Sequence, residues 1–107
     1  MPLSNLPILI KALLITAVLS VTACETAPPV QEMSDARQAI AVAREAGAAE
    51  HAAFHLRAAE DYLQSAEQKL NQREYLQARR DAKQAKMKAL DALKASEASR
   101  STREDSE

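Results

Sequence analysis

His51 and His55 are the two residues whose type and spacing most directly suggest chemistry. They are four residues apart, so on a helix both imidazoles lie on one side, which is the geometry of two metal ligands. The zinc-protease motif also needs a Glu between its two histidines, and the segment His51-Ala-Ala-Phe-His55 has none. With no Cys nearby to complete a site, we expect no metal and no cofactor. We interpret both residues as partly buried histidines at the border of an apolar helix face.

Catalytic groups are not recognisable elsewhere in the sequence. The only paired carboxylates that stand out are Glu60 and Asp61, and adjacent residues on a helix point to different faces. We therefore expect no catalytic residues, no small-molecule substrate and no enzymatic activity.

Cys24 is the only cysteine and follows an uncharged apolar run, residues 12–23. This run has the size of a signal-peptide core and is too short for a bilayer span of about 20 residues. Its end, Val21-Thr22-Ala23-Cys24, resembles the lipobox of bacterial lipoproteins, which implies cleavage after Ala23 and acylation of Cys24. Two or more acyl chains anchor a protein stably to a membrane. The alternative is an uncleaved anchor over residues 6–23 with a free thiol.

The residue after Cys24 carries information on sorting. Glu25 stands there, and in enteric-type bacteria an Asp at this place favours retention in the inner membrane. The resemblance therefore implies a lipid-anchored protein of the bacterial outer membrane that faces the periplasm.

Basic residues are concentrated in residues 69–94, and acidic residues in residues 25–67. On a helical wheel, four of the bases fall within an arc of roughly 80°: Arg73, Arg80, Lys83 and Lys94. One interpretation is a surface that binds an anionic lipid or an acidic partner. The other, which we favour from the sequence, is a solvated face that also complements the acidic helices.

Composition restricts the class of protein. Charged residues make up 27% of the 107 residues and nearly balance, giving a net charge of −1. That balance and the export signal both argue against a nucleic-acid partner. The single Gly excludes glycine-rich phosphate loops, and the single Cys excludes an internal disulfide. Alanine, the strongest helix former, is abundant, so we expect an all-α protein.

Periodic apolar residues predict three helices. The first has Ser34 as its N-cap and ends at Gly47, a natural left-handed C-cap. The second runs from about Glu50 to Leu70 and the third from Glu74 to about Ser96, joined by the turn Asn71-Gln72-Arg73, where Asn71 is suited to the left-handed conformation. The third helix carries a stripe of small residues: Ala78, Ala82, Ala85, Ala89 and Ala92.

The predicted second helix has two apolar sides. Leu56, Leu63 and Leu70 lie on one, and Phe54 and Ala58 lie roughly opposite. Because two apolar faces need two neighbours, we expect this helix to lie in the middle. Its leucines would face the alanines of the third helix and allow close approach. The fold is thus three antiparallel helices dominated by a long helical hairpin, with an alanine-rich core.

The expected organisation has four parts: a signal peptide over 1–23, the lipidated Cys24 with a proline-containing tether over 24–32, a helical domain over 33–96, and a disordered polar tail over 97–107. Alanines bury little area, and a single core below roughly 70–80 residues is marginal. We therefore expect self-association, or a protein partner that covers a free apolar edge.

The stretch Tyr62–Leu90 weakly resembles one tetratricopeptide repeat. The matching positions are Tyr62, Ala66, Tyr75, Ala78 and Ala85, whereas Gln72 or Arg73 replaces the preferred Gly and Ala82 replaces a large aromatic residue. One unit cannot form a solenoid, so the resemblance implies only a helical hairpin.

Together with the lipobox, residues Ile40, Gly47-Ala48 and Tyr75-Leu76-x-Ala78 make the mature chain similar to small bacterial envelope lipoproteins. These carry an α-helical domain of unknown function, a module also found ahead of peptidoglycan-binding domains of the outer-membrane-protein-A type. The resemblance covers about Ala27 to Ala95. It implies a non-enzymatic, lipid-anchored protein-interaction module of the cell envelope, and brings no catalytic residues with it.

Two alternative functions remain open. One is a structural spacer of the envelope, although breaks at Gly47 and Asn71 argue against a single long coiled coil. The other is a lipoprotein that binds a metal through His51 and His55, or an anionic lipid through the basic arc.

Overall fold

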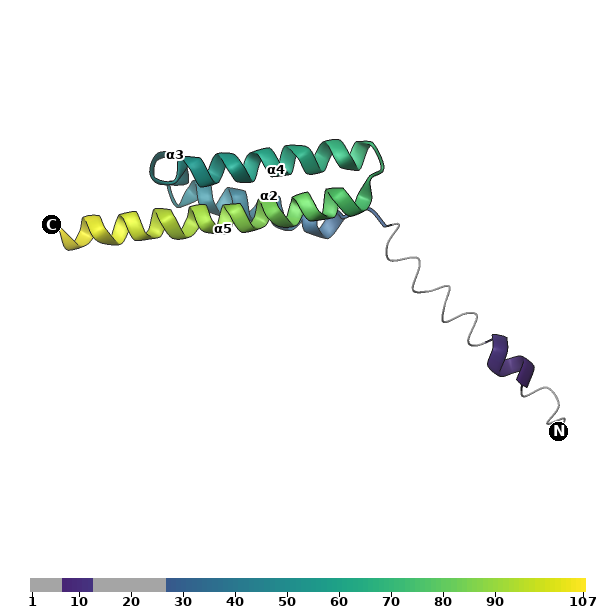
Figure 1. The fold of residues 1–107 in the computed structure, drawn as a ribbon. Helices are drawn as coiled ribbons and strands as arrows, with labels where there is room; N and C mark the ends of the chain where they lie inside the picture. Colours follow the sequence, from purple (N-terminus) through teal and green to yellow (C-terminus); the bar gives the residue numbers. More distant parts are fainter. Residues whose placement is uncertain (1–6, 13–26) are drawn as a thin grey trace.

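A computed structural model describes residues 7–12 and 27–107 of the protein. Residues 7–12 are helical, and the rest of the described chain forms four helices (Figure 1): α2 (Val30–Glu45), α3 (Ala48–His51), α4 (Ala53–Asn71) and α5 (Tyr75–Asp105). The described residues contain no strand, which confirms the all-α class. Cys24 and its lipobox, Val21, Thr22 and Ala23, lie outside the described residues.

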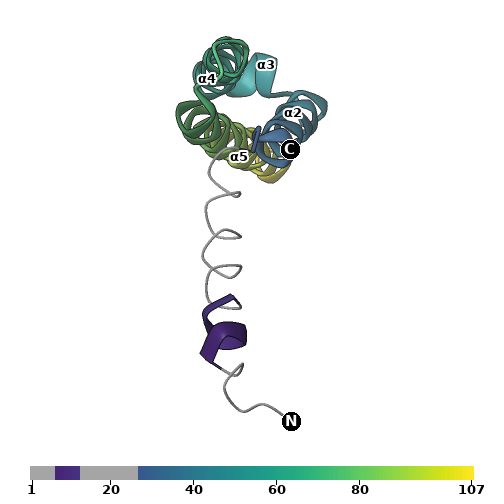
Figure 2. The same ribbon diagram turned by 90° about the vertical axis from the view of Figure 1, so that its right-hand side faces the viewer.

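Helices α2, α4 and α5 run up, down and up, and they lie at the corners of a triangle when viewed end-on (Figure 2). The most extensive packing joins α4 to α5, which is the predicted hairpin. Helix α5 also packs along α2, whereas α2 and α4 touch each other least of these three. The middle element is therefore α5, and the expectation that the second helix lies in the middle is wrong.

The core is made mainly of alanine. On α5, Ala78, Ala82, Ala85, Ala89 and Ala92 are fully buried, as the predicted stripe requires. Larger buried side chains come from the other two long helices: Met33 and Ile40 on α2, and Leu56 on α4. Small residues on α5 thus let two helices with larger side chains pack against it.

Helix α2 begins at Val30, four residues before the expected N-cap Ser34. Pro29 is buried and its carbonyl accepts a bond from the Met33 N–H at 3.0 Å. Proline is well tolerated at a helix start because its missing N–H would lack a partner there anyway, and Glu32 suits the positive end of the helix dipole. The tether expected over 24–32 therefore ends earlier.

The turn after α2 and the turn after α4 each contain one residue in the left-handed conformation. Gly47 has φ 87° just after α2, as predicted. At the end of α4, however, Arg73 and not Asn71 takes that conformation, with φ 61°. The N–H of Glu74 bonds the carbonyl of Lys69 and that of Arg73 bonds Leu70, the paired bonds of a Schellman motif. This motif places the left-handed residue two positions beyond the last helical residue.

The expected second helix is divided at Ala52, which has φ −147° and ψ 40°. Before the division lies the four-residue helix α3, and after it lies α4. Both Ala48 and Ala52 are buried. The break keeps them in the core while the chain reverses direction.

The tail is helical, which corrects the expectation of disorder over 97–107. Helix α5 continues to Asp105 without a break. Ser96 is fully buried, and Arg100 donates a hydrogen bond to the carbonyl of Ala46 at 3.4 Å. These contacts hold the helix past the predicted end, and the segment contains no Pro or Gly that would terminate it.

Candidate interaction surfaces

Ala27 and Glu32 are held beside the start of α5. The Arg79 guanidinium donates to the carbonyl of Ala27 at 3.0 Å, and its Nε lies 3.1 Å from a Glu32 carboxylate oxygen. Ala27 is three residues after Cys24, a reach of at most about 11 Å for an extended chain. An anchor on Cys24 would therefore hold the bundle by the end where α4 turns into α5.

The two histidines do not converge on a site. His51 is exposed, contrary to expectation, and His55 is half-buried. The His55 ring meets the ring of Phe54 edge-on, with centroids 5.6 Å apart. Across residues 7–12 and 27–107, no group of three or more His, Cys, Asp and Glu residues could hold a metal ion.

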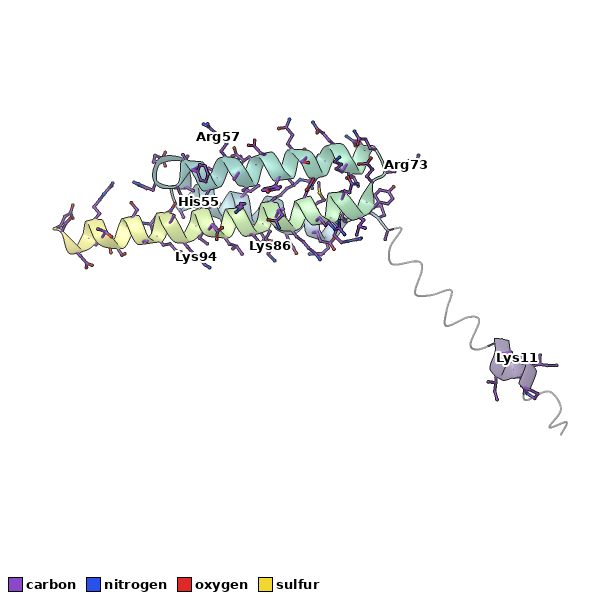
Figure 3. The ribbon with its side chains drawn as sticks, in the orientation of Figure 1. Lys11, His55, Arg57, Arg73, Lys86 and Lys94 are labelled. Atoms are coloured by element: carbon purple, nitrogen blue, oxygen red, sulfur yellow. The ribbon has the colours of Figure 1, made fainter. Side chains whose placement is uncertain are left out.

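The predicted basic arc is only partly one surface. Arg80, Lys83 and Lys94 are exposed on α5, whereas Arg73 lies in the preceding turn. Figure 3 shows Lys94 on the side of α5 that points away from α4. Three of the four cations therefore lie on one helix. The fourth, Arg73, is set apart because its backbone is not helical.

Large apolar side chains lie between these cations, and sequence reasoning missed them. Leu76 is 56% exposed, Met87 58% and Leu90 39%. They and the bases follow one another at steps of four and three residues, so all lie along one line opposite the buried alanines. We call this set the α5 outer face: Leu76, Arg80, Lys83, Met87, Leu90 and Lys94.

Two other bases of α5 form ion pairs with α2. Arg79 pairs with Glu32, and Lys86 lies 4.0 Å from an Asp35 carboxylate oxygen. Both acids belong to α2, so the expected complement between basic and acidic helices exists there. No ion pair within the described residues involves the bases of the α5 outer face.

A second uncovered surface lies on α4. Phe54 is 82% exposed and Tyr62 37% exposed, with the half-buried Ala58 between them at helical spacing. Tyr62 and Ala58, together with Asp61 and Ser65, line a shallow groove of about 370 Å³. The sequence predicted a helix against this side, and the structure leaves it open because α5, and not α4, is central. We call Phe54, Ala58 and Tyr62 the α4 strip.

Ion pairs join α2 to α4 at the surface of the bundle. Arg37 lies 3.1 Å from Glu67, and Arg44 pairs with Glu60. A groove of about 340 Å³ runs between these pairs, and Ile40 and Leu63 are among its lining residues. All four charged side chains are about half exposed, so the contact between α2 and α4 is the loosest of the three.

None of the helices within the described ranges is both long enough and apolar enough to cross a membrane. The fold and these surfaces define a small all-α domain in which a long helical hairpin carries a third helix. The chain belongs to the family described as "Domain of unknown function (DUF4398)", which matches residues 31–107. No curated protein matches the chain. No solved structure matches it either.

Proposed function

We propose that the protein is a non-enzymatic, lipid-anchored interaction module on the periplasmic side of the bacterial outer membrane. The anchor is the acylated Cys24, proposed from the lipobox Val21-Thr22-Ala23-Cys24. The α4 strip is the surface offered to a protein partner. The observation that supports this proposal most is that Phe54 is 82% exposed.

Exposing so much of an aromatic side chain to water is unfavourable, and a partner that covers it removes this cost. Aromatic residues are enriched where binding energy is concentrated in protein interfaces, because they bury much area with few rotatable bonds. Phe54 and Tyr62 are eight residues apart on one helix, so a partner can meet both at once. The shallow groove beside Tyr62 adds relief for the partner's side chains.

The position of the strip suits an anchored protein. Phe54 lies in the first turn of α4, at the end of the bundle near α3 (Figure 1), whereas Ala27 is bonded to Arg79 near the start of α5, at the other end. Phe54 is 17 positions from Asn71, the last residue of α4, which is roughly 25 Å along the helix. A protein held through Cys24 would present Phe54 away from its point of attachment.

A structural spacer built as one extended coiled coil fits the fold less well. The chain folds back at Gly47 and again at Arg73. A lipoprotein that binds a metal through His51 and His55 lacks a further ligand group among the described residues.

The anchor is tested by labelling cells with palmitate. We expect label on the wild-type protein and none on Cys24→Ser, which should persist as a heavier precursor. An unlabelled wild-type protein removes the anchor from the proposal.

The protein partner is tested by site-specific photo-crosslinking in living cells. A photoreactive residue at position 54 should give a discrete adduct, which Tyr62→Ala should diminish. The same residue at Gln38, exposed on α2, is the matched control and should give none. Equal adducts at both positions, or none at either, would contradict the role of the α4 strip.

A further inference from the structure

The α5 outer face has the composition of a membrane-surface helix. Leu76, Met87 and Leu90 share with three bases a line of roughly 27 Å, from position 76 to position 94. Helices that lie in the plane of a bilayer bury such apolar residues at the headgroup boundary and hold Lys and Arg against anionic lipid. Long basic side chains reach the headgroups while their methylene stems cover apolar surface.

Charge decides which occupant suits this face. Its bases have no ion-pair partner among the described residues, although Arg79 and Lys86 nearby on the same helix do. Two acids of α5 lie at the rim of the line, because Asp91 is four residues after Met87 and Glu97 is three residues after Lys94. The face therefore carries an excess of positive charge that a negative surface would neutralise.

A second copy of the chain is the poorer occupant. The line from Leu76 to Lys94 has the four-and-three spacing of a coiled-coil seam. Pairing two such seams in parallel would bring Arg80, Lys83 and Lys94 of one copy close to the same bases of the other, and antiparallel pairing would cover each base with an apolar side chain. Like charges at close range are repulsive, so the same residues that favour an anionic surface oppose self-pairing.

The proposed anchor would add to this binding without being required for it. Ala27 is bonded to Arg79 in the first turns of α5, so acyl chains on Cys24 would hold this helix close to a membrane. We propose that the α5 outer face lies flat on a bilayer surface rich in anionic phospholipid. The α4 strip belongs to another helix of the triangle and stays free (Figure 2). This binding goes beyond the proposed function, because it requires neither acylation nor a protein partner.

The test uses tryptophan fluorescence, since the sequence contains no Trp. The full chain with Cys24→Ser, which removes the acylation site, carries Met87→Trp as its only Trp. It is mixed with vesicles of phosphatidylcholine alone or of an equal mixture with phosphatidylglycerol. In the anionic vesicles we expect a blue shift and quenching by brominated acyl chains, and in phosphatidylcholine neither. Phe54→Trp is the matched reporter and should remain unquenched in both.

Charge is tested in the same chain by Lys83→Gln with Lys94→Gln. A base near an anionic surface contributes about a factor of five to binding, so the ratio of docked to undocked protein should fall roughly 10- to 30-fold. Arg57→Gln with Arg103→Gln is the control, because both residues are exposed, lie off the face and change the net charge equally. It should leave the ratio within about a factor of two. Circular dichroism checks that helix content is unchanged.

Three results would overturn the inference. One is fluorescence of the Met87→Trp chain that stays unquenched in anionic vesicles, and the second is quenching that is equal in both vesicle types. The third is a blue shift that grows with protein concentration in the absence of vesicles, which would identify a second copy as the occupant. Because the chain used cannot be acylated at position 24, none of these results bears on the lipid anchor.

Discussion

The inward face of α5 and the inward faces of α2 and α4 are built from residues of different size. Every buried position of α5 is Ala or Ser, whereas Met33, Ile40 and Leu56 are buried on the other two helices. Small residues let helices approach, and large ones bury the apolar area that drives folding. The comparison teaches that α5 sets the spacing of the bundle while α2 and α4 supply its large buried apolar side chains. Removing volume should therefore cost most on α2 and α4, and adding volume should cost most on α5.

The largest effect is expected from Ile40→Ala on α2. Ile40 is 2% exposed and belongs to the cluster that contains Leu56 and Ala89. The change removes buried methyl groups and leaves a cavity, so the free energy of unfolding should fall by about 2–5 kcal/mol. Urea unfolding followed by circular dichroism measures it. Val42→Ala, on the same helix and 41% exposed, is the control and should cost far less.

Adding volume to α5 should give the next largest effect. Ala85 is fully buried, and Ala85→Leu should lower the free energy of unfolding by about 1–3 kcal/mol through overpacking. Gln84→Leu introduces the same side chain at the exposed neighbouring position and should change stability by less than about 0.5 kcal/mol. A melting temperature that is unchanged by Ala85→Leu would mean that the spacing of the helices is not set by α5.

Much of this arrangement was predictable from local patterns. The stripe from Ala78 to Ala92 gave the buried face of α5, because a period of about 3.6 residues identifies one side of a helix. Gly47 marked the end of the first helix, because a residue without a side chain readily adopts positive φ. These features depend on a residue and its near neighbours only.

The errors arose where distant contacts decide the outcome. The tail from position 97 is polar and looks disordered alone, yet Arg100 reaches the carbonyl of Ala46, 54 residues away. Phe54 and Ala58 look like a buried face, because periodicity reports an apolar side and not whether another helix covers it. For the same reason, Leu76 and Met87 were not recognised as part of a surface together with Arg80, Lys83 and Lys94.

A smaller effect of opposite sign is expected at the end of the α5 stripe. Ser96 is fully buried, and its hydroxyl has no hydrogen-bond partner in the described part of the chain. Such a group is penalised by its lost contact with water, so Ser96→Ala should raise the free energy of unfolding by about 1 kcal/mol. Ser34→Ala, exposed in α2, reports the gain from helix propensity alone. If both changes stabilise equally, burial of the hydroxyl has no cost of its own.

The smallest effect is expected at the contact between α2 and α4, where neither the small residues of α5 nor large buried side chains dominate the packing. Arg37 and Glu67 join α2 to α4 across 3.1 Å, and their side chains are 53% and 47% exposed. Water screens such a pair, so a double-mutant cycle with Arg37→Ala and Glu67→Ala should give a coupling of about 0.5 kcal/mol. The coupling should shrink further in molar salt, where the screening length falls to about 3 Å. A coupling above about 2 kcal/mol would show that charge holds α2 to α4 as firmly as alanine packing holds both to α5. The contrast drawn between α5 and the other two helices would then be wrong.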